Sequence, residues 1–575
     1  MRRPSWAAVF FAQTPGGADR GIPNANPVPG VDVTTLAPSH RKLLDDVGGA
    51  MRARNARLAA TLAQDGLTSG LHHPLLFKAR ALWCAERGMH EAALADFRQA
   101  DLMSQPDAAI KGAIGASLMK LERFAEAIDA YRDAVAIQPN NAALHCRLGW
   151  ACELGQELAE ARLSHLRALE LDSDNPEILG RLAFLLTRTG SWTEARSYAA
   201  RALAADPNHA SAHLALATTD IEEGAYDAAD LRLAALLTDA RTTANNRYLA
   251  LGLLGDLRDR QDRVGEAMSA FAASKLEARK YYPVPLAPDG TTMSQAVSLL
   301  TAHFRHMPSL SPAAKAAAKS ADPTHHFFLL GFLRSGTTLM EQVLAGNPDV
   351  VSLEEREPAS DATVAFSPQA RKLRALAEAS EQTLDEYRER YWQKVRKLGV
   401  DVQNKIFIDK GPIYTVKLPV LVRLFPRAKF LFAIRDPRDV VLSCYRRRFR
   451  INPTTYEFLT LEGTARFYDS VMSLAEIYRD KLPLDIYEVR HESLVDDFDG
   501  QTRALCNFMG LPWNDAMRKF ADRSKLGAIA TASSAQIARG LNREGIGQWR
   551  RYAEELAPVL PILQPWVEKF GYAAA

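Results

Sequence analysis

The stretch Gly-Phe-Leu-Arg-Ser-Gly-Thr-Thr-Leu-Met, residues 331–340, decides the fold of the second half of this chain. An apolar run typical of a buried strand, His326–Leu333, leads into it, and a helical pattern follows at 336–346. A glycine-bearing turn between a strand and a helix aims backbone N–H groups at one point, at the positive end of the helix dipole. The stretch therefore predicts an anion-binding loop in an α/β domain.

The spacing of Gly331 and Gly336 resembles the phosphate loop of nucleotide triphosphatases. In that loop a lysine holds the β- and γ-phosphates, whereas this chain carries Thr337 there and has its cation earlier, at Arg334. An ATPase or a kinase would lack the main charge on the transferring phosphoryl group, so both activities are disfavoured.

The rest of this half alternates short apolar runs with helical patterns, which predicts a parallel sheet in a domain over 326–575. A proline-rich linker over 281–325 precedes it. Further strands are expected at Lys405–Ile408, Lys429–Ile434 and Leu484–Val489, and helices at 413–424, 437–448, 463–481 and 500–509.

The first half repeats itself every 34 residues, as the series Ala93, Ala127, Ala161, Ala195 and Ala229 shows. This period resembles tetratricopeptide repeats and predicts an all-α superhelix over 72–280, since no single unit can bury its apolar face alone. Such arrays recruit protein or peptide partners. The simpler alternative is that this array only forms a homodimer or makes the chain rigid. Residues 1–71 are expected to be a partly loose N-terminal segment.

Composition narrows the function. The 575 residues carry 71 Lys and Arg against 68 Asp and Glu, a net charge of +3 that predicts no general affinity for nucleic acid. Five scattered cysteines without a CxxC motif indicate reduced thiols in a cytoplasmic protein and no zinc site. No apolar run approaches the roughly 18 residues that a membrane span needs.

The strand–Arg–Ser–Gly–Thr–Thr–helix pattern resembles the 5′-phosphosulfate loop of sulfotransferases that use 3′-phosphoadenosine 5′-phosphosulfate (PAPS). The resemblance implies a P-loop-like sulfotransferase domain without a metal. It also implies that the donor binds to Arg334, Ser335, Gly336, Thr337 and Thr338.

A second motif follows another expected strand. Arg435 at the strand end and Ser443 two helical turns later could converge on one phosphate, with Arg447 one turn further. This spacing resembles the family's 3′-phosphate site, in which an Arg and a Ser eight residues later bind the donor. The resemblance therefore implies that these three residues hold the 3′-phosphate.

Near the C-terminus, Thr531–Gln536 and Gly547–Tyr552 resemble the family segment that closes over the donor. The resemblance implies that the Ser533 hydroxyl shares the sulfuryl charge. Two residues depart from the family pattern: Gln548 replaces a basic residue, and His491 replaces a tyrosine at a strand end, where a stacking or hydrogen-bonding role with the donor is expected.

The domain resembles tyrosylprotein sulfotransferases more than the small-molecule enzymes. In that group the base is a Glu twenty-one residues after the loop Arg, which lands on Glu355 among the acids Glu354 and Glu357. The family's Asn/Asp-Lys-x-Pro segment matches Lys410, which would stabilise the bridging oxygen. The implied acceptor is a hydroxyl group, and protein tyrosine, polysaccharide, lipid and small metabolite all remain open. The competing class is a non-catalytic repeat scaffold whose α/β domain only binds a nucleotide.

Overall fold

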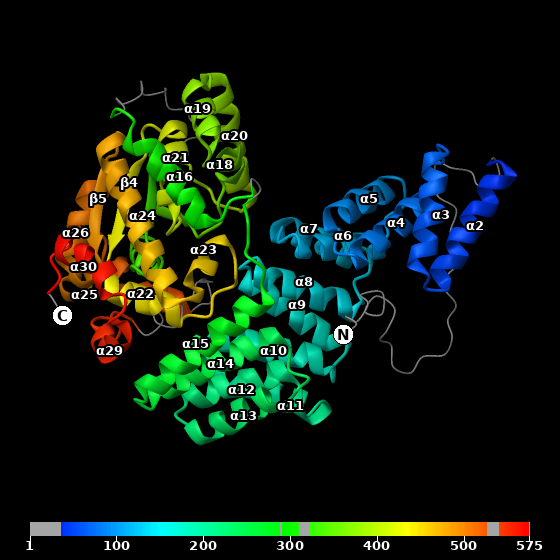
Figure 1. Ribbon diagram of the computed structural model, residues 1–575, viewed down its shortest axis with the longest axis horizontal. Coiled ribbons are helices and arrows are strands. Elements are labelled where there is room, and N and C mark those ends of the chain that lie inside the picture. Colours follow the sequence, from blue (N-terminus) through cyan, green and yellow to red (C-terminus); the bar gives the residue numbers. More distant parts are fainter. Residues whose placement is uncertain (1–35, 288–289, 310–322, 526–539, 574–575) are drawn as a thin grey trace. The chain divides into compact units, whose positions relative to one another are not determined.

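The computed structural model describes residues 36–287, 290–309, 323–525 and 540–573 (Figure 1). By its internal contacts the chain divides into two compact units. The first comprises Met1–Leu185 and Ala200–Pro207, and the second comprises Leu186–Ala199 and Asn208–Ala575. The boundary falls within α10 (Pro176–Arg188) and α11 (Trp192–Ala205).

The first unit is all-α in its described part, and consecutive helices pack as pairs (Figure 1). The pairs are α2 (Pro38–Arg52) with α3 (Ala56–Thr68), α4 (Pro74–Glu86) with α5 (His90–Leu102), α6 (Ala108–Lys120) with α7 (Phe124–Ile137), and α8 (Ala142–Leu154) with α9 (Leu158–Leu171). The predicted helical repeat array is confirmed, and α2 and α3 add a further pair before residue 72.

Small residues at the repeated positions let the two helices of a pair touch. A Cβ atom added at Gly115 would lie 2.9 Å from the Tyr131 ring, and one at Gly149 would lie 2.7 Å from the His165 ring. Each ring therefore fills the space above the glycine of its own pair. His165 is fully buried, with Nε2 2.8 Å from Glu153, as expected of a core residue.

The second unit contains the last helical pairs together with a sheet. The helices are α12 (Ala210–Glu222), α13 (Tyr226–Thr238), α14 (Ala244–Arg260) and α15 (Val264–Tyr281). Next comes α16 (Met293–Arg305), inside the expected linker, which packs on α24 (Leu461–Lys481), with the Phe304 and Tyr478 ring centroids 5.0 Å apart. This helix is therefore part of the α/β core.

Five parallel strands form the sheet, in the order β2-β3-β1-β4-β5. They are β1 (His325–Gly331), β2 (Val350–Leu353), β3 (Ile406–Lys410), β4 (Lys429–Ile434) and β5 (Ile486–Arg490). The predicted parallel sheet is confirmed; the short edge strand β2 was not predicted. Since all strands run the same way, the loops after β1, β3, β4 and β5 gather at one edge, where α/β sheets bind ligands.

Both faces of the sheet are covered, which is why β1 is apolar from Phe327 to Leu330. Phe328 and Leu330 point into one core cluster, and Phe327 and Leu329 into the other. The remaining helices are α17 (Thr337–Leu344), α18 (Ser360–Phe366), α19 (Ala370–Glu378), α20 (Glu381–Lys397), α21 (Leu418–Leu424), α22 (Pro437–Arg446), α23 (Pro453–Tyr456), α25 (His491–Asp496), α26 (Phe498–Met509), α27 (Phe520–Lys525), α29 (Ala553–Leu556) and α30 (Leu560–Lys569).

Two further features concern the whole described chain. All five cysteines are free. Among the described residues, no helix combines the length and apolar character that crossing a bilayer requires.

Candidate active site

The loop between β1 and α17 has the backbone of an anion-binding turn. Arg334 has φ 68°, a conformation that non-glycine residues seldom adopt and that clusters at functional sites. Gly336 has φ 100°, and a Cβ atom added there would lie 2.7 Å from His491 Nδ1. Only glycine fits this position, and it lies directly before the first turn of α17, whose N–H groups have no partner within the helix.

Three arginines meet beside this loop. Arg334 is half-buried, and its Nε donates a hydrogen bond to Ser443 Oγ at 3.0 Å. Arg435 Nη1 donates to the carbonyl of Arg334 at 3.0 Å, and Nη2 donates to the carbonyl of Gly545. Burial and the charges of Arg447 and Arg435 lower the Arg334 pKa to about 9. The predicted loop and the second motif are thus joined in one cationic cluster.

Buried polar atoms in this cluster fit an anion. Arg435 Nε and His491 Nδ1 are both buried without a hydrogen-bond partner among the described residues. Burial, followed by the charges of Arg435 and Arg334, lowers the His491 pKa to about 3, so the imidazole is neutral. Desolvated cations with an unused donor are unfavourable alone and favourable around phosphate, so these residues fit a phosphorylated donor.

A buried lysine lies at the end of the neighbouring strand. Lys410 is fully buried, and its Nζ lies 3.0 Å from Glu341 Oε2 and 3.1 Å from Glu355 Oε1. Glu341, on α17, is fully buried, whereas the Glu355 side chain, after β2, is 47 % exposed. Of these two carboxylates, only that of Glu355 can therefore meet both this lysine and a molecule arriving from solvent.

Charge and burial oppose each other at this lysine. Burial alone would lower the Lys410 pKa, but the charge of Glu341, followed by those of Glu355 and Glu354, outweighs it and raises the pKa. Burial raises the Glu341 pKa to about 7 in spite of Lys410. Lys410 therefore keeps its charge at neutral pH although its side chain is sealed from bulk solvent, where a cation acts most strongly.

Comparison with known proteins agrees with this geometry. Residues 326–515 match the sulfotransferase family, and residues 108–141 and 157–218 match tetratricopeptide repeats. The chain joins tetratricopeptide repeats to a sulfotransferase domain.

Three relatives resemble part of the chain. An uncharacterized protein of Aquifex aeolicus is 29 % identical over 42 % of this chain and 32 % of its own length. Protein-tyrosine sulfotransferase 1 of Danio rerio is 25 % identical over 43 % of this chain and 71 % of its own. Omega-hydroxy-beta-dihydromenaquinone-9 sulfotransferase of Mycobacterium bovis is 30 % identical over 19 % and 30 %. The chain thus spans only about a third of the Aquifex and Mycobacterium proteins.

In the sulfotransferase domain, a buried hydrogen-bond network holds the residues next to Lys410 in place. The carboxylate of Asp409 accepts hydrogen bonds from the hydroxyls of Tyr391, at 2.7 Å, and Tyr414, at 2.9 Å. The Tyr414 ring lies against Gly411, where a side chain would collide with it. Burial raises the Asp409 pKa to about 7. The residues on both sides of Lys410 are thereby fixed.

Most of the expected site residues gather at this edge. Ser335, Thr337 and Thr338 are buried in the loop and the first turn of α17. Ser533 lies outside the described residues, so its expected role stays a prediction. Gln548 accepts a hydrogen bond from Arg446 Nη1 at 3.2 Å.

The closing segment is held by α22. The backbone N–H groups of Gly547 and Trp549 donate to the carboxylate of Asp439 at 2.6 and 2.9 Å, and Arg438 stacks on the Trp549 ring, 3.7 Å from its centroid. The described part of this segment therefore lies beside Arg435, and its closure over the donor stays a prediction.

Glu341 is the site residue that the sequence analysis missed. A signal was present, because a lone carboxylate stands in the otherwise apolar or neutral helix that follows the loop. A buried carboxylate on this helix requires a cation beside it, and that cation is Lys410 at the end of β3.

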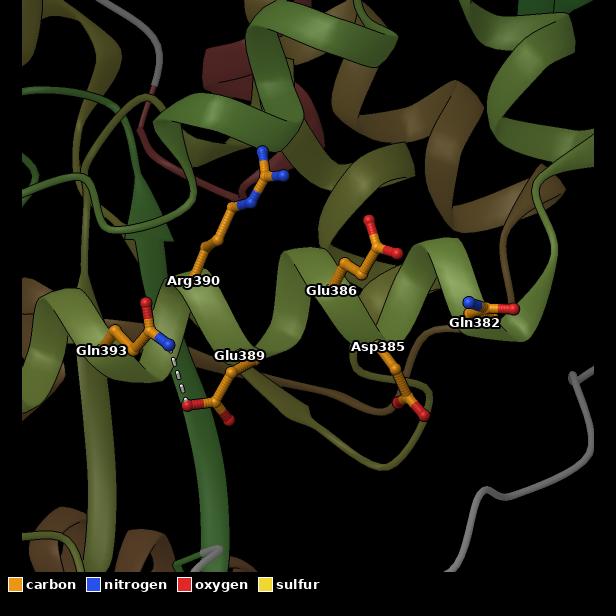
Figure 2. Close-up of a pocket in the computed structure, with 6 residues that line it drawn as sticks. All are labelled: Gln382, Asp385, Glu386, Glu389, Arg390 and Gln393. Carbon is orange, nitrogen blue, oxygen red and sulfur yellow. Dashed lines mark hydrogen bonds between the residues drawn. The ribbon is translucent and has the colours of Figure 1, made fainter.

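A separate surface groove on α20 does not fit the donor. Figure 2 shows its lining side chains, all from this one helix: Gln382, Asp385, Glu386, Glu389, Arg390 and Gln393. Three carboxylates against one guanidinium would repel a phosphorylated ligand.

Proposed function

We propose that this chain transfers a sulfuryl group from PAPS to a hydroxyl group of an acceptor. The observation that carries the proposal is the position of two buried features at one edge of the sheet: the arginine cluster with its unpartnered Arg435 Nε, and Lys410 between two carboxylates. Sulfuryl transfer to a hydroxyl group requires cations for the donor and a base for the acceptor.

The loop and the arginine cluster would hold the donor. Arg334 and the residues Ser335 to Thr338 suit its phosphosulfate end, because they combine a cation with the N-terminus of α17. Arg435, Ser443 and Arg447 suit the 3′-phosphate, and the neutral His491 offers a hydrogen bond beside Gly336. When bound, PAPS supplies an activated sulfuryl group on a phosphate leaving group.

Lys410 and Glu355 would carry the chemistry. Lys410, which is charged and sealed from solvent, stabilises negative charge on the bridging oxygen, together with Arg334 and, by resemblance, Ser533. Glu355 reaches both Lys410 and solvent, so its carboxylate can accept the proton of the acceptor hydroxyl. Glu341 is sealed from solvent and serves to hold Lys410 in place.

Nucleotide binding gives the first test. In calorimetric titrations of the intact chain, we expect 3′-phosphoadenosine 5′-phosphate to bind more tightly than AMP or ADP, with or without magnesium. Arg435→Ala should weaken this binding by about 10–100-fold, since charge-assisted hydrogen bonds are removed.

The alternatives predict other results. Preference for ADP with magnesium would overturn the proposal in favour of a kinase. Selective binding of the 3′-phosphorylated nucleotide without transfer to any hydroxyl acceptor would instead support the non-catalytic scaffold. The pair of buried Lys410 and half-exposed Glu355 argues against that scaffold, because binding a nucleotide does not require a charged lysine sealed from solvent beside an accessible carboxylate.

We further propose that the acceptor is a protein tyrosine, recruited by the repeats. The Danio rerio relative is named for protein tyrosine, whereas the Mycobacterium relative is named for a dihydromenaquinone. The repeat array favours the first class, because repeat arrays present extended surfaces to which a polypeptide can bind.

Kinetics of the intact chain test this assignment. With a tyrosine-containing acidic peptide and with 4-nitrophenol as acceptors, we expect kcat/KM to favour the peptide by about tenfold or more, since binding away from the reacting group contributes to catalysis. Equal kcat/KM values for the two acceptors would contradict recruitment by the repeats.

A further inference from the structure

The last helical pair, α14 with α15, lies in the same compact unit as the sheet and contacts the chain directly after α22. That segment, residues 447–449, begins with Arg447, whose N–H donates to the carbonyl of Ser443 at 3.3 Å. The Ser443 hydroxyl accepts a hydrogen bond from Arg334, and the charge of Arg447 is among those that lower the Arg334 pKa. The final repeat therefore touches the edge of the proposed donor site.

Two acids on α14 form ion pairs with the arginines on either side of Arg447. Asp259 pairs with Arg446, and Asp256 pairs with Arg448 at 2.5 Å. Asp259 also accepts a hydrogen bond from the Tyr552 hydroxyl at 2.6 Å. The last repeat thus pairs with two members of the arginine triplet, one on each side of Arg447.

Two further contacts fix the backbone of the segment. Lys275 Nζ, on α15, donates to the carbonyl of Arg447 at 2.5 Å, and the Tyr248 hydroxyl, on α14, donates to the carbonyl of Phe449 at 3.1 Å. Lys275 is 3 % exposed, and burial lowers its pKa to about 7. Among the described residues, the hydrogen bond of Lys275 goes to a carbonyl and not to a carboxylate, and burying a lysine in this way costs free energy of folding. Stability alone therefore does not explain why a lysine occupies this position.

We propose that the final repeat contributes to the donor site. Lys275 and Tyr248 are positioning residues that hold the backbone around Arg447, so that its side chain can bind the 3′-phosphate. This inference rests on the proposed function. It divides the repeats into a final pair that serves the sulfotransferase domain and earlier pairs that remain available to an acceptor.

A Lys275→Met variant of the full chain tests the proposal. Methionine fills a similar volume without a donor or a charge. We expect the affinity for 3′-phosphoadenosine 5′-phosphate to fall by about tenfold and the affinity for AMP to change much less, because AMP lacks the 3′-phosphate that Arg447 would bind. Lys280→Met is the matched control on α15: Lys280 is exposed and pairs with Glu277, and its loss should alter neither affinity.

Melting temperature and nucleotide affinity together distinguish a change in the orientation of Arg447 from a general loss of folding. A melting temperature of the nucleotide-free variant no lower than that of the wild type, with a selective loss of the 3′-phosphorylated ligand, supports the proposal. Unchanged affinity, or an equal loss for both nucleotides, overturns it. Tyr248→Phe, which removes one hydroxyl, should give a smaller selective loss and provides the answer if Lys275→Met does not fold. Failure of the proposed function would look different, because the wild type itself would not prefer the 3′-phosphorylated nucleotide.

Discussion

A Lys410→Met variant is expected to lose sulfuryl transfer by about 10²–10³-fold, the usual effect of removing one group that stabilises developing charge. The reason is its position: Lys410 is fully buried at the end of β3, the strand that pairs with β1, and bulk solvent cannot reach it to substitute for its charge. Transfer is measured with a radiolabelled or coupled assay under saturating donor.

The same substitution should also destabilise the domain. It leaves the buried carboxylate of Glu341 without its cation, and breaking a buried pair in this way costs about 3–5 kcal/mol. The control is the double variant Lys410→Met/Glu341→Gln, which removes the stranded charge. We expect it to regain much of the lost stability in denaturant unfolding but not the transfer activity. Recovery of both would show that Lys410 acts only in folding.

Local sequence patterns were sufficient for the elements whose cause is local. The loop at 331–340 predicts its strand and helix because glycine positions and hydroxyl residues are short-range signals, and β1 and α17 follow from them. The 34-residue period predicts the helical pairs because small residues recur where two helices touch, as Gly149 against the His165 ring shows.

What the sequence could not supply depends on contacts between distant segments. The carboxylate of Glu341 and the ammonium of Lys410 are far apart in the chain and meet only when β3 pairs with β1. Likewise the pairs of Arg446 with Asp259 and of Arg448 with Asp256 join residues 187 and 192 positions apart, and no local pattern signals them. The edge strand β2 was missed because four residues carry too weak a period.

Glu355→Gln is the second variant with a large expected effect. If its carboxylate accepts the proton of the acceptor, the amide cannot, and transfer should fall by about 10²–10⁴-fold. Lys410 keeps its pair with Glu341, so the fold should be retained. Nucleotide affinity should be unchanged or slightly tighter, because a negative charge that acts on Arg334 has been removed. Transfer assays and calorimetry on the same preparation measure both.

The neighbouring acid Glu357 provides the matched control, because its carboxylate pairs with Lys417 at 2.7 Å instead of with Lys410. Glu357→Gln should therefore keep transfer within a few-fold of the wild type. Full activity in Glu355→Gln would remove Glu355 as the base, and an equal loss in both variants would mean that the acidic loop acts as a whole. A selective loss in Glu355→Gln, with nucleotide binding intact, assigns proton acceptance to the one carboxylate that reaches both the buried lysine and solvent.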